Sequence, residues 1–194
     1  EIIKKYLIDN YNIPEKDITV TVNGIDTEKF SEKTPDAKLK KEFGIEDGDK
    51  VIVYVSRMDT DRSLVAHQLI SAFDSLYTII DNLKCIIVGD GNDFEKVREE
   101  AERINEKYGK KAIILAGRRT DISEIIAFAD LFVGVSRAAL EAMSAEKPSI
   151  IAGNEGYIGL FNEDKLEVSL KTNFCCRGEK MSDVAVLTQD IANF

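Results

Sequence analysis

Residues 129–151, ADLFVGVSRAALEAMSAEKPSII, combine a short apolar strand, a helix and a second apolar strand in direct succession. We predict that the first strand stops at Gly134, that the helix opens after Ser136, and that Glu141 lies in its second turn. Pro148 follows the helix and prevents its continuation. Such a strand–glycine–helix corner directs free backbone N–H groups and the positive end of the helix dipole to one place, which favours a phosphate group. The stretch therefore predicts an α/β fold with an anion site at one corner.

The alternation of apolar strands and amphipathic helices continues outward from this corner. The helices show apolar positions three or four residues apart, such as Leu69, Phe73 and Leu76. Strands that are apolar throughout are typical of a parallel sheet covered on both faces. We therefore predict an α/β fold, with a Rossmann-like parallel sheet and helices on both faces. Its five strands are expected at residues 51–55, 85–88, 112–116, 131–133 and 149–152, and a glycine-rich loop is expected at 153–159.

Two of these helices carry recognisable start signals. Asn92 with Glu95 three residues later fits a capping box. Asp121 with Glu124 fits the start of a short helix. Both signals predict a side chain that accepts hydrogen bonds from the first-turn N–H groups.

The charge balance and the cysteines limit the partners and the cellular location that we expect. The 194-residue chain has a net charge of −9, which disfavours nucleic acid and direct adhesion to an anionic membrane face. No segment has the length of a transmembrane helix, and we expect no signal peptide. Cys85 and the adjacent Cys175-Cys176 show neither a disulfide framework nor CxxC metal spacing, so we predict a cytoplasmic location. No acidic cluster has metal-ligand spacing, so we predict no metal and no cofactor.

Ligands on such sheets bind at the carboxyl ends of the strands, which selects the candidate site residues. Arg57 directly follows a strand and can clamp a diphosphate through two parallel hydrogen bonds, and Arg62 can reach the same anion. The alternative for both arginines is a surface pair with Asp59 and Asp61. The other positions at strand ends include Gly117, Arg118, Gly134, Ser136, Arg137, Glu155 and Gly156.

Several well-known motifs are absent. The turn at residues 89–91 does not form GxGxxG, which disfavours a nicotinamide cofactor. Neither a GxxxxGK[ST] loop nor a GxSxG elbow occurs. His67, the single histidine, lies inside a helix and is expected to be structural, which makes a Ser-His-Asp hydrolase improbable.

A set of motifs occurs in a fixed order along the chain: VNGIDTEKF (22–30), VSRMD (55–59), IIVGDGNDFEKV (86–97), ILAGRR (114–119), ADLFVG (129–134) and ALEAMSAEKPSII (139–151). Together with the glycine-rich loop that follows, they resemble the group 1 (family four) glycosyltransferases. The resemblance covers about residues 18–160 and corresponds to the C-terminal, donor-binding domain of a GT-B fold. It implies retaining transfer of a sugar from a nucleoside-diphosphate sugar, with a UDP-sugar as the first candidate, to an acceptor such as a cell-surface or lipid-linked glycan.

The resemblance also implies roles for individual residues. The family's diphosphate-binding arginine falls on Arg57, its following lysine falls on Arg62, and its ribose-binding glutamate falls on Glu141. The helix N-terminus that receives phosphate falls on Ser136, Arg137 and Ala138, and the loop near the base falls on Gly117 and Arg118.

One position departs from the family pattern. The family carries Glu-x7-Glu, and its first glutamate begins a loop that contacts the donor sugar. Counting back from Glu141 leads to Val133, inside the predicted strand, and the loop to the helix is short. Arg137 and Glu155 are the nearest polar replacements, which leaves the sugar specificity and the activity open.

The two ends of the chain differ from the middle. A helix is predicted over residues 1–12, a strand over 18–22 and a turn at Asn23-Gly24. Because the chain begins with Glu1 and a helical pattern from Leu187 looks cut short, we expect an excised fragment. The expected divisions are the end of a missing N-terminal domain with the first strand, a connector, a Rossmann-like nucleotide-sugar-binding domain and a truncated C-terminal extension, at residues 1–30, 31–49, 50–170 and 171–194.

Two alternatives to the donor domain stay open. One is a non-catalytic α/β nucleotide-binding or interaction module, motivated by the absent glutamate. The other is a GT-B-like sugar-nucleotide epimerase, whose catalytic residues would lie in the missing domain. For the glycosyltransferase, too, we expect the catalytic residues and the acceptor site in that domain, so this fragment should bind without turning over. The full-length protein is expected in the cytoplasm or at the inner face of the membrane.

Overall fold

The chain folds around a six-stranded sheet with the strand order β3-β2-β1-β4-β5-β6. The computed structural model describes residues 2–21 and 24–194. Strands β1 to β5 are parallel, and β6 runs antiparallel to β5 at one edge. This confirms the predicted α/β class with a mostly parallel sheet. The strands are β1 (Lys50–Val55), β2 (Leu83–Val88), β3 (Ile113–Gly117), β4 (Leu131–Gly134), β5 (Ser149–Gly153) and β6 (Gly156–Leu160).

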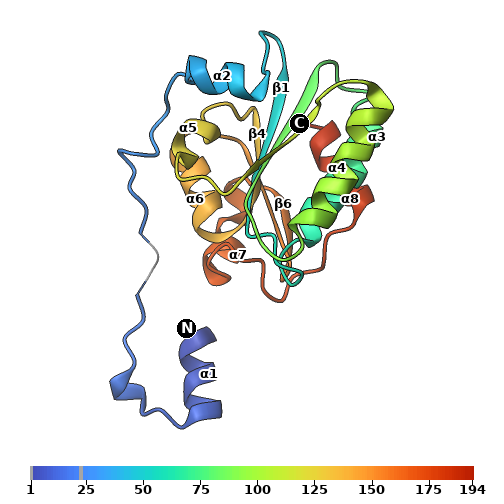
Figure 1. Ribbon diagram of the computed structural model, residues 1–194. Coiled ribbons are helices and arrows are strands. Elements are labelled where there is room, and N and C mark those ends of the chain that lie inside the picture. Colours follow the sequence, from blue (N-terminus) through green and yellow to red (C-terminus); the bar gives the residue numbers. More distant parts are fainter. Residues whose placement is uncertain (1, 22–23) are drawn as a thin grey trace.

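Helices cover both faces of the sheet (Figure 1). One face carries α3 (Leu64–Leu76), α4 (Phe94–Tyr108) and α8 (Val184–Ala192). The other carries α2 (Ala37–Phe43), α5 (Ile122–Ile126) and α6 (Ser136–Ser144), and α7 (Leu166–Lys171) follows β6 through the 3-10 turn Glu163–Lys165. None of the helices within the described residues combines the length and the hydrophobicity needed to cross a bilayer.

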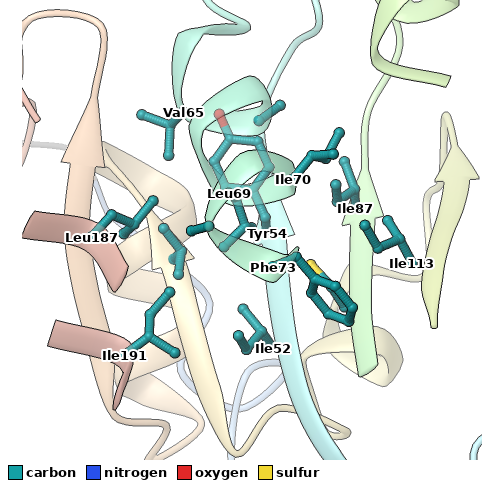
Figure 2. Packing of buried hydrophobic residues seen from close by; sticks show 14 of the residues in the cluster. Ile52, Tyr54, Val65, Leu69, Ile70, Phe73, Ile87, Ile113, Leu187 and Ile191 are labelled. Atoms are coloured by element: carbon teal, nitrogen blue, oxygen red, sulfur yellow. The ribbon is translucent and has the colours of Figure 1, made fainter. Parts of the chain in front are cut away.

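Strand β1 explains why the apolar runs are continuous. Successive side chains of a strand point to opposite faces, so a strand covered twice needs apolar residues at every position. Ile52 and Tyr54 face α3 and α8, as Figure 2 shows, whereas Val51 and Val53 belong to the cluster on the other face. Burial raises the pKa of Tyr54 to about 12. The sheet is therefore the shared wall of two apolar cores.

The sixth strand corrects the predicted loop at residues 153–159. Gly156–Leu160 returns along β5 as an antiparallel strand, with Ile150 opposite Leu160. Gly156 and Gly159 have φ values of +150° and +83°, and the register shifts between Ile151 and Ala152. These glycines hid the strand in the sequence, because glycine is depleted in strands and common in loops.

The predicted caps of two helices are not formed. Asn92 accepts hydrogen bonds from Thr60 through its side-chain oxygen, at 2.9 and 3.1 Å, and the N-cap of α4 is Asp93 without a side-chain cap bond. Asp121 precedes α5, but its carboxylate binds the guanidinium of Arg119 at 2.9 and 2.6 Å. In both places another group binds the oxygen that the pattern assigns to the helix: Thr60, 32 residues away, for Asn92, and the nearby Arg119 for Asp121.

The N-terminal residues confirm the helix and correct the strand. The helix α1 (Ile2–Tyr11) is present and is followed by a 3-10 turn at Glu15–Asp17. Residues 18–21 form no strand, whereas Val22 and Asn23 of the predicted strand and turn lie outside the described residues. Figure 1 shows α1 apart from the sheet. A strand is stable only beside a partner that satisfies its backbone groups, and residues 18–21 pair with none of the described strands.

Segments predicted as a connector and as an extension contribute to the two cores. Leu39 and Phe43 in the connector, and Phe30 just before it, are buried with the α5 and α6 face. In the C-terminal segment, Leu187 and Ile191 of α8 are buried against α3 (Figure 2). The Rossmann-like core therefore uses residues on both sides of the range 50–170.

Candidate functional site

The carboxyl ends of β1, β4 and β5 surround a cavity of about 280 Å³. Three neighbouring strands end there, which is the position where open parallel sheets bind ligands. The volume lies near the lower bound for small-molecule pockets. The residues that line the cavity include Ser56, Arg62, Gly134, Ser136, Glu155 and Arg177.

The corner between β4 and α6 forms one wall of the cavity. Val135 is the single residue between the strand and the helix, as expected for a shortened loop. Ser136 has φ +53°, and its backbone N–H donates to the carbonyl of Phe174 at 2.7 Å. The expectation that this N–H is free is therefore wrong, because a later segment binds it. The N–H groups of Arg137 and Ala138 follow in the first turn, where the helix itself supplies no acceptor.

Glu141 lies in the second turn of α6, as predicted. It is buried, with 7% of its surface exposed, and its carboxylate accepts a hydrogen bond from Nε of Arg137 at 2.8 Å. The side chains are four residues apart on one face of the helix, so they meet by helix geometry. Neither residue lines the cavity, and the Glu141 carboxylate is occupied by Arg137.

The two arginines after β1 differ in position. Arg62 lines the cavity, whereas Arg57 does not. The surface pairs considered as the alternative are present: Arg57 Nη1 lies 3.6 Å from Asp59 Oδ2, and Arg62 Nε lies 3.7 Å from Asp61 Oδ2. Both arginine side chains are more than half exposed, so these pairs contribute little to stability and leave the guanidinium groups available.

Gly117 and Arg118 lie at the end of β3 and do not line the cavity. Gly117 ends β3 with φ +65°, and Arg118 follows it. Strand β3 is separated from β1 by β2, so these two residues share the edge of the sheet with the cavity but do not line it. The neighbouring Arg119 is held by Glu42 and Asp121, whose hydrogen bonds raise the pKa of Arg119.

A family comparison decides what kind of domain carries this site. A sequence profile of the family described as "Glycosyl transferases group 1" matches residues 35–185. The chain belongs to the group 1 glycosyl transferases. This group 1 chain is 27% identical over 143 residues to N-acetyl-alpha-D-glucosaminyl L-malate synthase of Bacillus anthracis, covering 71% of the chain and 36% of that protein. It spans between 36% and 42% of the length of the curated relatives it matches.

Solved structures share the fold of this group 1 chain. A glycosyltransferase from Rickettsia africae superposes with a TM-score of 0.68 at 19% identity, over 98% of this chain and 50% of that one. Anabaena HepE, solved in complex with UDP and glucose, superposes with a TM-score of 0.59 at 22% identity, over 75% of this chain and 40% of that one. The likeness establishes that the sheet and its helices form one half of a GT-B glycosyltransferase architecture.

The structure of this glycosyltransferase chain places the absent glutamate position inside the sheet. Val133 is fully buried in β4, with Tyr54 of β1 on one side and Ile150 of β5 on the other. A carboxylate could not replace Val133 without an uncompensated charge in the core. Any contact to a donor sugar must therefore come from another segment.

Arg177 is the cavity residue that sequence reasoning missed. It belongs to the irregular segment between α7 and α8, and its guanidinium binds the carboxylate of Glu155 at 2.7, 3.0 and 3.1 Å. These hydrogen bonds raise the pKa of Arg177 and keep it charged. No periodicity links it to the strand ends, because the contact joins residues 22 positions apart through a hairpin and a helix. Gly156, which follows Glu155 in the chain, does not line the cavity.

The single histidine lies outside the cavity. His67 Nε2 is 2.8 Å from Asp93 Oδ2, and its Nδ1 is 2.7 Å from Glu100 Oε2. Ser63 donates its hydroxyl to Asp93 at 2.5 Å. The serine thus contacts the carboxylate rather than the imidazole, which is not the order that activates a nucleophile. The cluster ties the start of α3 to α4, as expected for a structural histidine.

Proposed function

We propose that the chain is the donor-binding domain of a retaining glycosyltransferase that uses a UDP-sugar. The observation that carries the proposal is the cavity at the carboxyl ends of β1, β4 and β5, where the start of α6 and Arg62 meet. UDP in the Anabaena structure of the same fold supports the choice of nucleotide. The acceptor, for which we propose a cell-surface or lipid-linked glycan, would be bound by a domain outside this chain.

A diphosphate fits the wall formed by α6 and the residues after β1. The N–H groups of Arg137 and Ala138 stand at the positive end of a helix of nine residues, which favours an anion there. Arg62 adds a full charge at the cavity wall, and Arg57 adds a second one nearby if its side chain turns from Asp59. The chain has a net charge of −9, so a diphosphate needs a local group of positive charges such as this one.

The remaining predicted contacts complete the nucleotide. We propose that Glu141 accepts hydrogen bonds from the ribose hydroxyls once Arg137 moves from its carboxylate to the phosphates, and that Gly117 and Arg118 lie near the base. The guanidinium of Arg137 can bind either a carboxylate or a phosphate, because the oxygens of both anions accept its N–H groups. The domain would act from the cytoplasm or from the inner face of the membrane.

A thermal-shift series tests this function. The unfolding temperature is measured with UDP, GDP and ADP, each at a concentration well above its expected dissociation constant. We expect UDP to raise it, because a ligand at 100 times its dissociation constant stabilises the folded state by about 2.7 kcal/mol. Arg62→Ala and Arg57→Ala should reduce the shift. Arg98→Ala is the matched control, because Arg98 pairs with Glu95 on the surface of α4.

A non-catalytic binding or interaction module is the second candidate. The buried valine at position 133 favours it, because the family's sugar-contacting glutamate cannot be restored there. A folded chain whose unfolding temperature responds to no nucleotide up to millimolar concentration would overturn the donor domain and support this module. A response to UDP that Arg62→Ala leaves intact would overturn the proposed diphosphate site.

A further inference from the structure

The segment at residues 172–178, TNFCCRG, brings a second wall to the cavity. We propose that the ion pair of Glu155 and Arg177 binds hydroxyl groups of an uncharged donor sugar, in place of the glutamate that is absent at Val133. The inference rests on the proposed function, since it assigns the sugar end of the same donor. It names Arg177 as a residue that determines specificity.

The geometry of the pair leaves hydrogen-bonding capacity on both partners. Glu155 contacts Nε and Nη2 of Arg177, so the Nη1 group keeps its two donors. The carboxylate of Glu155 has about four acceptor positions and uses three contacts to one side. A fixed donor beside a fixed acceptor matches a hydroxyl pair, because each sugar hydroxyl both donates and accepts. The pair also lines the cavity in which α6 begins.

The segment that carries Arg177 is attached to the α6 corner. The carbonyl of Phe174 accepts the Ser136 N–H at 2.7 Å, and the ring of Phe174 packs on Phe161 with 5.7 Å between centroids. The thiol of Cys176 is buried and lies 3.5 Å from the carbonyl of Ile151 in β5. Three contacts therefore hold Arg177 relative to the corner where the phosphates are proposed to bind.

A glycine in the hairpin makes room for the segment. A Cβ atom on Gly156 would lie 2.2 Å from the carbonyl oxygen of Cys176. Glycine at this position lets the segment approach β6 directly, which places Arg177 opposite Glu155 in the adjoining turn. The close approach and the ion pair are thus two parts of one arrangement.

The backbone of the segment is strained. Asn173, Phe174 and Cys176 have φ values of +53°, +55° and +60° without being glycine. Such conformations cost free energy and concentrate at functional sites. The ion pair does not offset that cost, because its side chains are 43% and 45% exposed and exposed pairs contribute little. A role of Arg177 in ligand binding would explain why this strained conformation is kept.

The charge of the pair selects an uncharged sugar. Glu155 and Arg177 are neutral in sum, so they offer hydrogen bonds without a net attraction for a second anion. A uronic acid would bring a carboxylate to the carboxylate of Glu155 and would have to compete with it for Arg177. We therefore expect neutral hexoses to gain from this subsite and UDP-glucuronic acid to gain less.

Calorimetric titration of the full 194-residue chain tests the assignment. The affinities for UDP, UDP-glucose, UDP-galactose, UDP-N-acetylglucosamine and UDP-glucuronic acid are compared. We expect at least one neutral UDP-sugar to bind about tenfold more tightly than UDP, which corresponds to about 1.4 kcal/mol. Arg177→Ala and Glu155→Gln should remove that difference while the affinity for UDP stays within twofold. Arg98→Ala is the control with an exposed pair elsewhere.

A swapped pair separates binding from a structural role. Glu155→Arg combined with Arg177→Glu keeps an ion pair but exchanges donor and acceptor. If the pair only holds the segment, the swap restores the preference for the UDP-sugar, and the inference is overturned. It is also overturned if Arg177→Ala keeps the preference or if wild type shows none. Absence of UDP binding in wild type is a different result, which overturns the proposed function itself.

Discussion

His67 shows how one residue couples stability to pH. Its imidazole lies between the carboxylates of Asp93 and Glu100, and Lys96 lies 3.6 Å from Asp93 on the far side. Burial of the ring lowers the pKa of His67, but the hydrogen bonds that the ring donates to the carboxylates of Asp93 and Glu100, together with the charges of these carboxylates, outweigh burial and leave the pKa above its ordinary value of 6.5. Protonation of His67 therefore favours the folded state.

We predict that the stabilisation by His67 is complete below pH 6.5 and is lost as the pH rises through the raised pKa. The measurement is urea unfolding of wild type and His67→Gln at a series of pH values. The difference in unfolding free energy should shrink above pH 6.5, because glutamine does not titrate. NMR of this single histidine reports its pKa directly, and a value at or below 6.5 in the folded protein would refute the prediction.

Gly156, at the start of β6, is the residue at which an added methyl group should most disturb the packing of the 172–178 segment. Its φ of +150° disfavours an L side chain, and an added Cβ would meet the Cys176 carbonyl at 2.2 Å. We expect Gly156→Ala to lower the unfolding free energy by about 3 kcal/mol. Gly178→Ala is the matched control, since Gly178 has φ +88° but no atom within 4 Å, and it should cost about 1–2 kcal/mol. Equal losses in urea unfolding would contradict the close approach.

At the scale of single elements, helix α8 was predicted as part of a C-terminal extension, whereas in the structure it packs in a core. Leu187 is fully buried between α8 and α3, whereas Val186 on the same helix is 40% exposed. We expect Leu187→Ala to cost about 2–5 kcal/mol, since it removes buried methyl groups and leaves a cavity. Val186→Ala should stay within about 0.5 kcal/mol. Similar losses from the two variants in urea unfolding would show that α8 does not belong to the core.

The strands that were predicted and the strand that was missed differ in how clearly their own residues indicate a strand. Strands β1 to β5 are apolar at nearly every position because helices cover both faces, so their own residues reveal them. Strand β6 contains two glycines, which hide it in the sequence, and the side chains of Asn92 and Asp121 bind Thr60 and Arg119 instead of capping their helices. Local patterns fail where another group competes for the same polar atom.

At the scale of the whole molecule, we predict that the isolated chain binds a UDP-sugar without turning it over. Transfer requires donor and acceptor to be held together and shielded from water. This chain spans between 36% and 42% of the length of the curated relatives it matches. Release of free sugar and UDP, followed by chromatography, should stay at the rate without protein under conditions where UDP raises the unfolding temperature. Release that depends on Arg62 would contradict this prediction, and Arg98→Ala should change neither measurement.

The candidate site was predictable only where its residues lie at the ends of strands. Arg62, Gly134, Ser136 and Glu155 were predicted because they lie at or after strand ends, and parallel strands bring their carboxyl ends to one edge. All four line the cavity, and their contact with a ligand stays a prediction. Arg177 could not be found this way, because it is placed by the packing of an irregular segment on the hairpin. The pairing of Arg137 with Glu141 is local, but the sequence does not show that it occupies the proposed ribose contact.

The sequence by itself determined the fold class, the order of the five parallel strands along the chain, the β4–α6 corner and the absence of a glutamate at position 133. These follow from apolar periodicity and from residue identity, both of which are local. The tertiary structure alone decided that β6 forms one edge of the sheet, that the Ser136 N–H is already bound by Phe174, and that Arg177 pairs with Glu155 at the cavity. The contacts of Ser136 with Phe174 and of Glu155 with Arg177 join residues far apart in the chain, which only folding brings together, and the glycines of β6 hide its pairing with β5.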